Sequence, residues 1–290
     1  MFAADFDYYR AGSVAEARQL LARHPGAKLL AGGHSLIPLL KLRLASPGAV
    51  IDIGRIAELR GITVGTGGLR IGALTTHAEL AASAEVRQHA EALAEAASQV
   101  GDPAVRNRGT IGGNVAHADP ASDLPTVLAA LGATVAVAGA NGERSVGAAE
   151  FFQGVMMTAL GEHDLLTTID LPAAVSGQGT AYVKFPHPAS RYAVIGVAAS
   201  VTVSGGSCTA AAVTVGGLVP APVRCAAVER ALTGQGLSAD TIATAAGKVT
   251  GDLGADDALL GDIFASAAYR KAVAPVYVRR ALTAAAERAG

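Results

Sequence analysis

The chain has 290 residues, of which 51% are hydrophobic and 16% charged, and a formal net charge of −1. This composition supplies enough apolar surface for two or three buried cores. Because the net charge is near zero and no lysine or arginine run occurs, the composition excludes the basic surface that nucleic-acid binding requires. The first residues show no basic segment followed by an apolar core, so we expect no secretory signal peptide and a cytoplasmic protein.

An N-terminal subdomain is predicted over residues 1–56. Ser13 and Glu16 have the spacing of a capping box, which predicts the start of a helix that ends near His24. The elements expected after it are a short buried strand at 28–30, one or two helical turns packed on a core at 36–44, and a strand at 49–53.

A second subdomain is predicted over residues 57–175, beginning with a hairpin at 62–71. A capping box at Thr76 and Glu79 starts the helical part. The later elements expected are a long alanine-rich helix at 86–100, an irregular stretch at 101–125, a helix with Asp123 as N-cap that ends at Gly132, and strands at 134–138 and 165–171 with a turn at Asn141-Gly142. Long irregular segments inside a compact domain tend to be functional.

The composition changes to small linker residues at 173–179, which places a C-terminal domain at 178–288. The longest uncharged stretch, 192–223, contains Gly205 and Gly206 in its middle and Pro220 near its end, so it predicts a hairpin and no membrane span. We expect three antiparallel strands (182–184, 194–203 and 210–215) and three helices (223–233, 239–249 and 264–288), the last kinked or broken at Pro275. The fold class is therefore predicted as α+β, with two α/β subdomains followed by a three-stranded sheet and a three-helix bundle.

Two glycine-rich segments carry the strongest functional signal in the chain. They are Ala31-Gly32-Gly33-His34-Ser35 and Thr110-Ile111-Gly112-Gly113-Asn114. A Gly-Gly step permits positive φ and lets a ligand approach main-chain N–H groups that a Cβ would shield. Such loops hold anions, above all phosphates, so two of them indicate a site for the pyrophosphate of a dinucleotide.

Other motifs are absent or incomplete. The segment around Gly65, Gly67 and Gly68 lacks the third glycine of the common dinucleotide fingerprint and falls in a hairpin. The only two cysteines, Cys208 and Cys225, are too few for an iron–sulfur cluster or a structural zinc site. We therefore expect no metal site in this chain, and we interpret both cysteines as buried apolar residues.

Both glycine segments, together with Ser122-Asp123-Leu124-Pro125 and the segment 184–192, closely resemble the flavoprotein (medium) subunit of the molybdenum hydroxylases. Aerobic carbon monoxide dehydrogenase and the xanthine dehydrogenases belong to this family, and the resemblance is strongest to the medium subunit of the carbon monoxide dehydrogenase type. It covers nearly the whole chain. The resemblance implies a PCMH-type FAD-binding fold.

The resemblance also implies FAD as cofactor. The two glycine segments would wrap its pyrophosphate through backbone N–H groups, Ser35, Thr110 and Asn114, and His34 would stabilise its loop. Asp123 would accept hydrogen bonds from a ribose or ribityl hydroxyl, Leu166 would line the pocket, Lys184 would lie near the isoalloxazine, and Tyr192 would stack on it. For Asp123 a plain helix cap, and for Lys184 a solvated surface lysine, are the structural alternatives. No catalytic residue is implied.

By the same resemblance the chain would be an electron-transfer subunit that is inactive on substrate alone, because a large molybdopterin-containing subunit oxidises the substrate. A small subunit with [2Fe–2S] clusters would deliver the electrons, and an external acceptor would take them from FAD. Family habit suggests a dimer of heterotrimers. Two alternatives stay open from the residues: a stand-alone FAD-dependent oxidase or reductase, and a docking subunit that has lost FAD. The sequence identifies neither the reducing substrate nor the acceptor.

Overall fold

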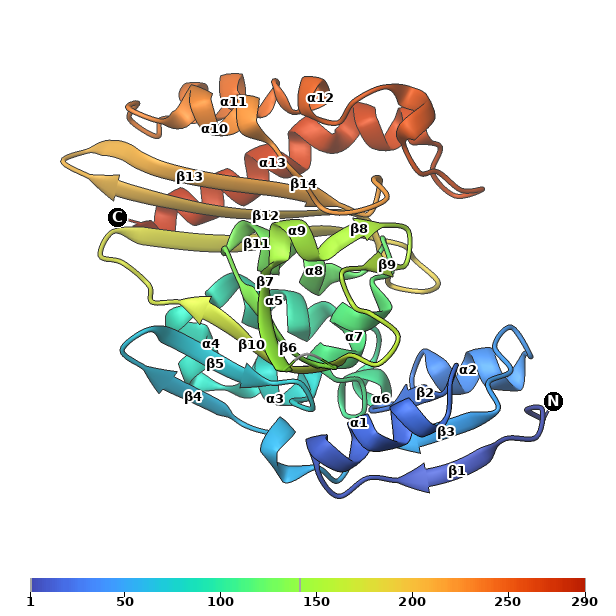
Figure 1. The fold of residues 1–290 in the computed structure, drawn as a ribbon. Helices are drawn as coiled ribbons and strands as arrows, with labels where there is room; N and C mark the ends of the chain where they lie inside the picture. Colours follow the sequence, from blue (N-terminus) through green and yellow to red (C-terminus); the bar gives the residue numbers. More distant parts are fainter. Residues whose placement is uncertain (1, 141, 290) are drawn as a thin grey trace.

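The computed structural model describes residues 2–140 and 142–289. Its N-terminal unit is a parallel three-stranded sheet with the strand order β1-β3-β2, covered by helices (Figure 1). The elements are β1 (Asp7–Arg10), α1 (Val14–Arg23), β2 (Lys28–Leu30), α2 (Leu36–Lys41), β3 (Ala49–Asp52) and the 3-10 turn η1 (Ala57–Leu59).

The helix, strand, helix, strand order expected here is confirmed, and the Ser13 hydroxyl caps α1 by accepting from the Glu16 N–H. Strand β1 was not expected. Helix α2 also differs from expectation, because only Leu40 of its residues is buried and Leu44 beyond its end is 73% exposed. The leucine spacing there therefore does not mark a core-facing helix.

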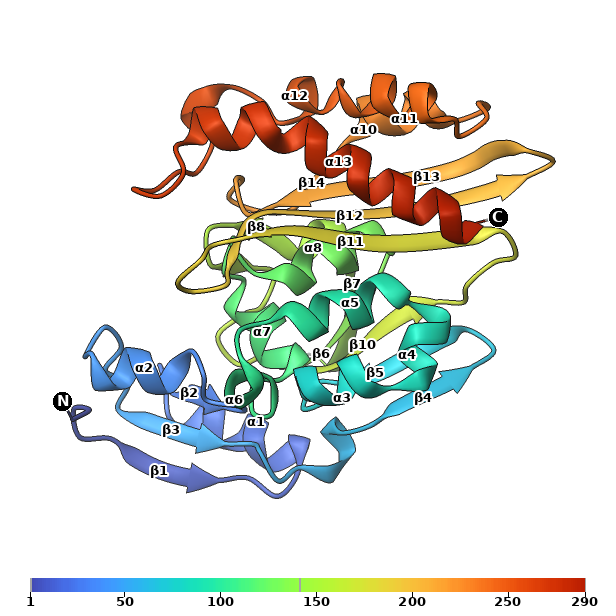
Figure 2. The ribbon, with the colours of Figure 1, turned by 180° about the vertical axis from the view of Figure 1, so that it is seen from behind.

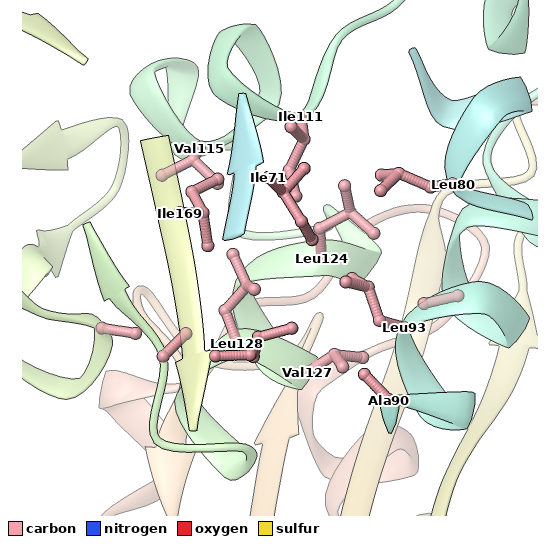
Figure 3. Close-up of a cluster of buried hydrophobic side chains, with 14 of the residues drawn as sticks. Ile71, Leu80, Ala90, Leu93, Ile111, Val115, Leu124, Val127, Leu128 and Ile169 are labelled. Carbon is pink, nitrogen blue, oxygen red and sulfur yellow. The ribbon is translucent and has the colours of Figure 1, made fainter. Parts of the chain in front are cut away.

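The middle unit is an antiparallel five-stranded sheet in the order β4-β5-β10-β6-β7. Its strands are β4 (Ile62–Gly65), β5 (Gly68–Gly72), β6 (Thr134–Gly139), β7 (Gly142–Gly147) and β10 (Leu165–Pro172), and β8 (Phe152–Gly154) pairs separately with β9 (Met157–Thr158). Its helices are α3 (His77–Ala82), α4 (Ala84–His89), α5 (Glu91–Gln99), α6 (Pro103–Arg106), α7 (Ile111–His117), α8 (Asp123–Ala130) and α9 (Ala148–Phe151). Figure 3 shows Ile71 and Ile169 of the sheet pointing toward Leu124 and Leu128 of α8 in the core between the layers.

Three predictions for this unit need correction or lie outside the described residues. The alanine-rich helix is divided at Ala90 (φ −155°, ψ 60°), where α5 starts anew, and the Ala92 N–H in its first turn donates to the Thr180 hydroxyl at 3.2 Å. The stretch expected to be irregular contains α6 and α7. The turn predicted at Asn141-Gly142 involves Asn141, which lies outside the described residues.

The C-terminal unit is an antiparallel sheet in the order β11-β12-β13-β14. It consists of β11 (Gln178–Pro186), β12 (Ala193–Ser204), β13 (Ser207–Gly216), β14 (Val223–Arg224), α10 (Ala226–Leu232), α11 (Ala239–Ala246), α12 (Val249–Asp252), the 3-10 turn η2 (Asp256–Ala258) and α13 (Ala267–Ala289). The two-residue β14 adds to the three strands expected. Helix α13 continues through Pro275 without a break.

The C-terminal sheet lies between two helical layers (Figures 1 and 2). Helix α13 packs on one side against β11 and β12, whereas α5 and α8 of the middle unit pack against the same sheet from the other side. Burial from both sides explains why β12 is uncharged, with every residue from 193 to 201 buried. Within the described ranges, no helix is long and apolar enough to cross a membrane.

Candidate functional site

A cavity of about 770 Å³ lies where the N-terminal unit meets the middle unit, and it extends to the loop between β11 and β12. All the predicted site residues except Ile111 and Lys184 line it. These are Ala31, Gly32, Gly33, His34, Ser35, Thr110, Gly112, Gly113, Asn114, Asp123, Leu166 and Tyr192. The structure thus brings the two glycine segments to one cavity, although they are distant in the sequence.

Two of the glycines allow close packing of the chain beside the cavity. A Cβ on Gly32 would overlap the carbonyl oxygen of Arg108, and a Cβ on Gly112 would lie 2.6 Å from the Cβ of Ala73. Gly33 has a φ of +80°, a conformation that favours glycine. Gly32 and Gly112 are therefore required for packing, in addition to any role toward a ligand.

The two segments differ in the N–H groups that they leave for a ligand. In the second segment the four N–H groups from Ile111 to Asn114 donate within the protein, to Thr75, Ala73, the Thr110 hydroxyl and the Thr110 carbonyl respectively. In the first segment the N–H groups of Gly32, Gly33, His34 and Ser35 have no acceptor among the described residues. The main-chain donors that fit a phosphate thus come from the first segment, and the second offers side chains.

Polar side chains beside these loops keep part of their hydrogen-bonding capacity. Ser35 makes no side-chain cap to α2. The Asn114 oxygen accepts from the Ser122 hydroxyl at 2.8 Å, which leaves the amide NH₂ group for another partner. His34 Nε2 lies 3.1 Å from the carbonyl oxygen of Ala104 in α6, so this histidine links its loop to that helix. Ile111 is fully buried in the core.

Asp123 presents a carboxylate to the cavity that is held from behind by two side chains. Its Oδ2 accepts from Lys184 Nζ at 2.9 Å, and its Oδ1 accepts from the Tyr182 hydroxyl at 2.6 Å. Lys184 also donates to the Gln99 carbonyl at 3.1 Å. The interpretation of Asp123 as a helix cap is wrong by one position, because Ser122 is the N-cap of α8. Lys184 is no surface lysine, since its side chain is 1% exposed.

Burial raises the pKa of the Asp123 carboxyl group above its usual value, while Lys184 and Tyr182 oppose this shift. Burial and the neighbouring carboxylate raise the pKa of Tyr182 well above its ordinary range. Sequence reasoning missed Tyr182. The available signal was its position two residues before Lys184 in one strand, which puts both side chains on the same face.

Tyr192 and Leu166 both line the cavity and differ in exposure. Tyr192 is 45% exposed at the mouth, in a loop closed by a hydrogen bond of 2.8 Å from the His187 N–H to the Tyr192 carbonyl. Leu166 is buried in β10. An aromatic ring at the opening and an aliphatic side chain inside provide surfaces for planar rings.

Sequence reasoning also missed His77, which lines the cavity. It is the first residue of α3, it is buried, and its Nδ1 has no hydrogen-bond partner in the part of the chain that is described. Burial, and then the nearby His34 and Arg106, lower the pKa of His77 to about 4. The imidazole is therefore neutral at physiological pH.

The two cysteines are buried and free, as predicted. Burial raises the pKa of both thiols, so neither is an activated thiolate.

Comparison with known proteins identifies the family. Residues 4–174 match the family described as FAD binding domain in molybdopterin dehydrogenase, and residues 180–285 match the CO dehydrogenase flavoprotein C-terminal domain. The carbon monoxide dehydrogenase medium chain of Hydrogenophaga pseudoflava is 39% identical over 97% of this chain and 96% of that protein. The glyceraldehyde dehydrogenase medium chain of Sulfolobus acidocaldarius is 36% identical over 97% of this chain and 98% of that protein.

A solved structure agrees with the sequence comparison. Carbon monoxide dehydrogenase from Hydrogenophaga pseudoflava, in a form that lacks the Mo-pyranopterin moiety of the molybdenum cofactor, superimposes with a TM-score of 0.94 at 39% identity and covers 99% of both chains. The resemblance inferred from the sequence is confirmed. The chain belongs to the FAD-binding medium subunits of the molybdenum hydroxylase family, and it is an oxidoreductase component whose cofactor is FAD.

Proposed function

We propose that this chain is the electron-transfer subunit of a molybdenum hydroxylase. It would receive electrons from [2Fe–2S] clusters of a small partner subunit and pass them to an external acceptor. A large molybdopterin-containing subunit would oxidise the substrate, in an assembly organised as a dimer of heterotrimers. The relatives named medium chains support a place in such an assembly.

The observation that carries this proposal is the continuous cavity from the glycine segments to Tyr192 at the surface. A dinucleotide bound by its pyrophosphate at the first segment could extend to the exposed mouth. Bound FAD supplies the capacity to accept electrons one at a time and release them as a pair. An opening beside the aromatic side chain of Tyr192 is where electron donors and acceptors would approach.

Each proposed binding residue has a role that its geometry supports. The N–H groups of the first segment would donate to phosphate oxygens, together with the hydroxyls of Ser35 and Thr110 and the amide of Asn114. Asp123 would accept from a ribose or ribityl hydroxyl. Leu166 would pack on a ring, and Tyr192 would cover the isoalloxazine and limit its contact with water. Ile111 would act through packing alone.

Lys184 would act through Asp123, because its ammonium group lies behind the carboxylate and outside the cavity lining. The resemblance implies that Lys184 lies near the isoalloxazine, and in this proposal it acts through the carboxylate. Tyr182 would share this orienting role. Neither residue needs to exchange a proton with a substrate, which agrees with a subunit whose chemistry is electron transfer.

The test is to load the chain with FAD and follow the flavin absorbance by stopped flow. We expect rapid bleaching on mixing with a reduced [2Fe–2S] protein of this family. We expect no bleaching with aldehydes, purines, N-heterocycles or carbon monoxide alone. Turnover of any of these substrates by the isolated chain would overturn the proposal in favour of a stand-alone FAD enzyme.

A further inference from the structure

A second, smaller hollow lies at the carboxyl edge of the N-terminal parallel sheet. It has a volume of about 250 Å³. Arg10, Asp52 and Leu30 line it, and they are the last residues of β1, β3 and β2, which lie side by side in the register of the sheet. Open α/β sheets bind their ligands outside the carboxyl ends of parallel strands. The hollow thus occupies a position at which this architecture forms binding sites.

The hollow is separate from the larger cavity in which FAD is proposed to bind, although the two share a wall. Ala31 and Gly32 line both. The wall is thin, because Gly32 packs directly on the backbone of Arg108 and Gly109. A ligand in the hollow would therefore lie against the first glycine segment, which also lines the cavity.

The charge of the hollow is strongly positive. Three arginines from separate segments, Arg10, Arg55 and Arg108, line it with one carboxylate, Asp52, so its formal charge is +2, whereas the whole chain has a net charge of −1. The guanidinium groups of Arg55 and Arg108 are in no ion pair or hydrogen bond with another described residue, and both residues are exposed. Two cationic residues of the lining are thus without a counter-charge among the described residues.

Asp52, the carboxylate of the lining, is held by groups other than Arg55 and Arg108. Its Oδ2 accepts from the Tyr8 hydroxyl at 2.6 Å and its Oδ1 from the Gly54 N–H at 2.8 Å. Arg10 lies farther away, with 3.7 Å between its Nε and Asp52 Oδ2, and it also donates to the Tyr8 hydroxyl at 3.2 Å. The Tyr8 and Asp52 pair therefore holds Arg10 at the rim of the hollow.

We propose that this hollow is an oxyanion site that binds the phosphate group of a small molecule. Guanidinium groups bind phosphate oxygens through paired N–H donors in a fixed fork, and a dianion matches the charge of the hollow. The site is independent of the proposed electron-transfer role. Free phosphate and a phosphorylated metabolite present the same group to it.

The experiment is isothermal titration of the FAD-saturated full chain at constant ionic strength, once with inorganic phosphate and once with glycerol phosphate. Saturation with FAD keeps the glycine segments from contributing a second phosphate site. The test variant is Arg55→Gln with Arg108→Gln. The control is Arg230→Gln, because Arg230 is an exposed arginine on α10 in the C-terminal unit.

We expect saturable binding to the wild type and to the control, and a loss of affinity of about tenfold or more in the double variant, because each arginine contributes charge-assisted hydrogen bonds. Tighter binding of glycerol phosphate than of inorganic phosphate would indicate that the ligand is a phosphorylated metabolite. Equal or tighter binding of inorganic phosphate would indicate that the ligand is free phosphate. Both outcomes support the site. Bound FAD and the unfolding midpoint are measured in parallel to show that the variant is folded. No saturable binding to the wild type, or equal binding to the double variant, would overturn the proposal.

Discussion

Lys184 and Asp123 form an ion pair that is buried on both sides, with 2.9 Å between Nζ and Oδ2, and only the carboxylate of the pair lines the cavity. Isolated, such a carboxylate would be protonated to avoid the cost of burying a charge. The lysine therefore keeps a hydrogen-bond acceptor ionised at the wall where the cofactor is proposed to bind. Removing one member of a buried pair is costly because the other charge is left uncompensated.

Replacing Lys184 by Met should make FAD affinity depend on pH. Burial raises the pKa of Asp123 and Lys184 opposes this, so the variant's carboxyl pKa rises further. Below that new pKa the protonated group is a poorer acceptor, and FAD affinity should fall by about tenfold or more. It should recover as the pH rises. Equilibrium dialysis of FAD across the pH range measures this.

The matched control is Tyr182→Phe, which removes one neutral hydrogen bond from the same carboxylate and should shift the profile less. Parallel pH profiles for the wild type and Lys184→Met would show that Lys184 does not act through Asp123.

Alanine at Gly112 should lower the stability of the fold, whereas alanine at Gly113 should lower the affinity for FAD. The new Cβ at Gly112 would lie 2.6 and 2.7 Å from the Cβ and carbonyl oxygen of Ala73, so the fold should lose about 1–3 kcal/mol. At Gly113 the close neighbour is only the Thr110 hydroxyl at 2.9 Å, which can rotate away at a cost of about 1 kcal/mol. Gly113→Ala should therefore stay folded and bind FAD more weakly.

Urea unfolding and FAD dialysis on both variants separate these effects. If Gly113→Ala bound FAD as tightly as the wild type, the second glycine segment would not face the cofactor closely.

His77 should contribute to acid sensitivity. Its pKa is about 4 in the folded protein and 6.5 when unperturbed, so between these values the unfolded chain binds a proton that the folded chain does not. The unfolding free energy should therefore fall as the pH drops from 6.5 to 4, by at most about 3 kcal/mol from this residue. Urea unfolding of His77→Gln should show a shallower acid dependence than the wild type.

His89→Gln is the control, because His89 is a partly exposed residue at the end of α4. Identical slopes for His77→Gln and the wild type would mean that His77 titrates normally.

Tyr192 should quench the fluorescence of bound FAD. A tyrosine ring stacked on an isoalloxazine quenches its emission by electron transfer, so Tyr192→Ala should increase the emission of each bound flavin. Tyr192 is 45% exposed, so the substitution should leave the unfolding midpoint nearly unchanged. Unchanged emission per bound FAD would place the isoalloxazine away from Tyr192.

Local patterns in the sequence predicted much of the fold. The caps at Ser13 and Thr76 form as predicted. The hairpin between β12 and β13 also forms, since its glycines allow the turn. The break at Ala90 was not predictable from local pattern, because the acceptor for the Ala92 N–H at the new helix start is a hydroxyl from a distant strand. Likewise, the leucine spacing in α2 does not reveal that, of its residues, only Leu40 is buried.

The candidate site was predictable in its residue types and not in its contacts. The glycine pattern located the two segments that line the cavity. It could not show that all four N–H groups from Ile111 to Asn114 are used within the protein, since the acceptors of two of them lie outside the segment, on Ala73 and Thr75. Nor could it show that Lys184 lies behind Asp123, because strand pairing and helix packing set that position.

The most direct test of the account is equilibrium dialysis of FAD against the purified wild-type chain, with Asp123→Asn in parallel. The account predicts saturation at about one FAD per chain, competition by ADP through its pyrophosphate, and weaker binding to the variant. Absence of saturable binding, or equal affinity and stoichiometry in the variant, would contradict the assignment of this cavity as the FAD site.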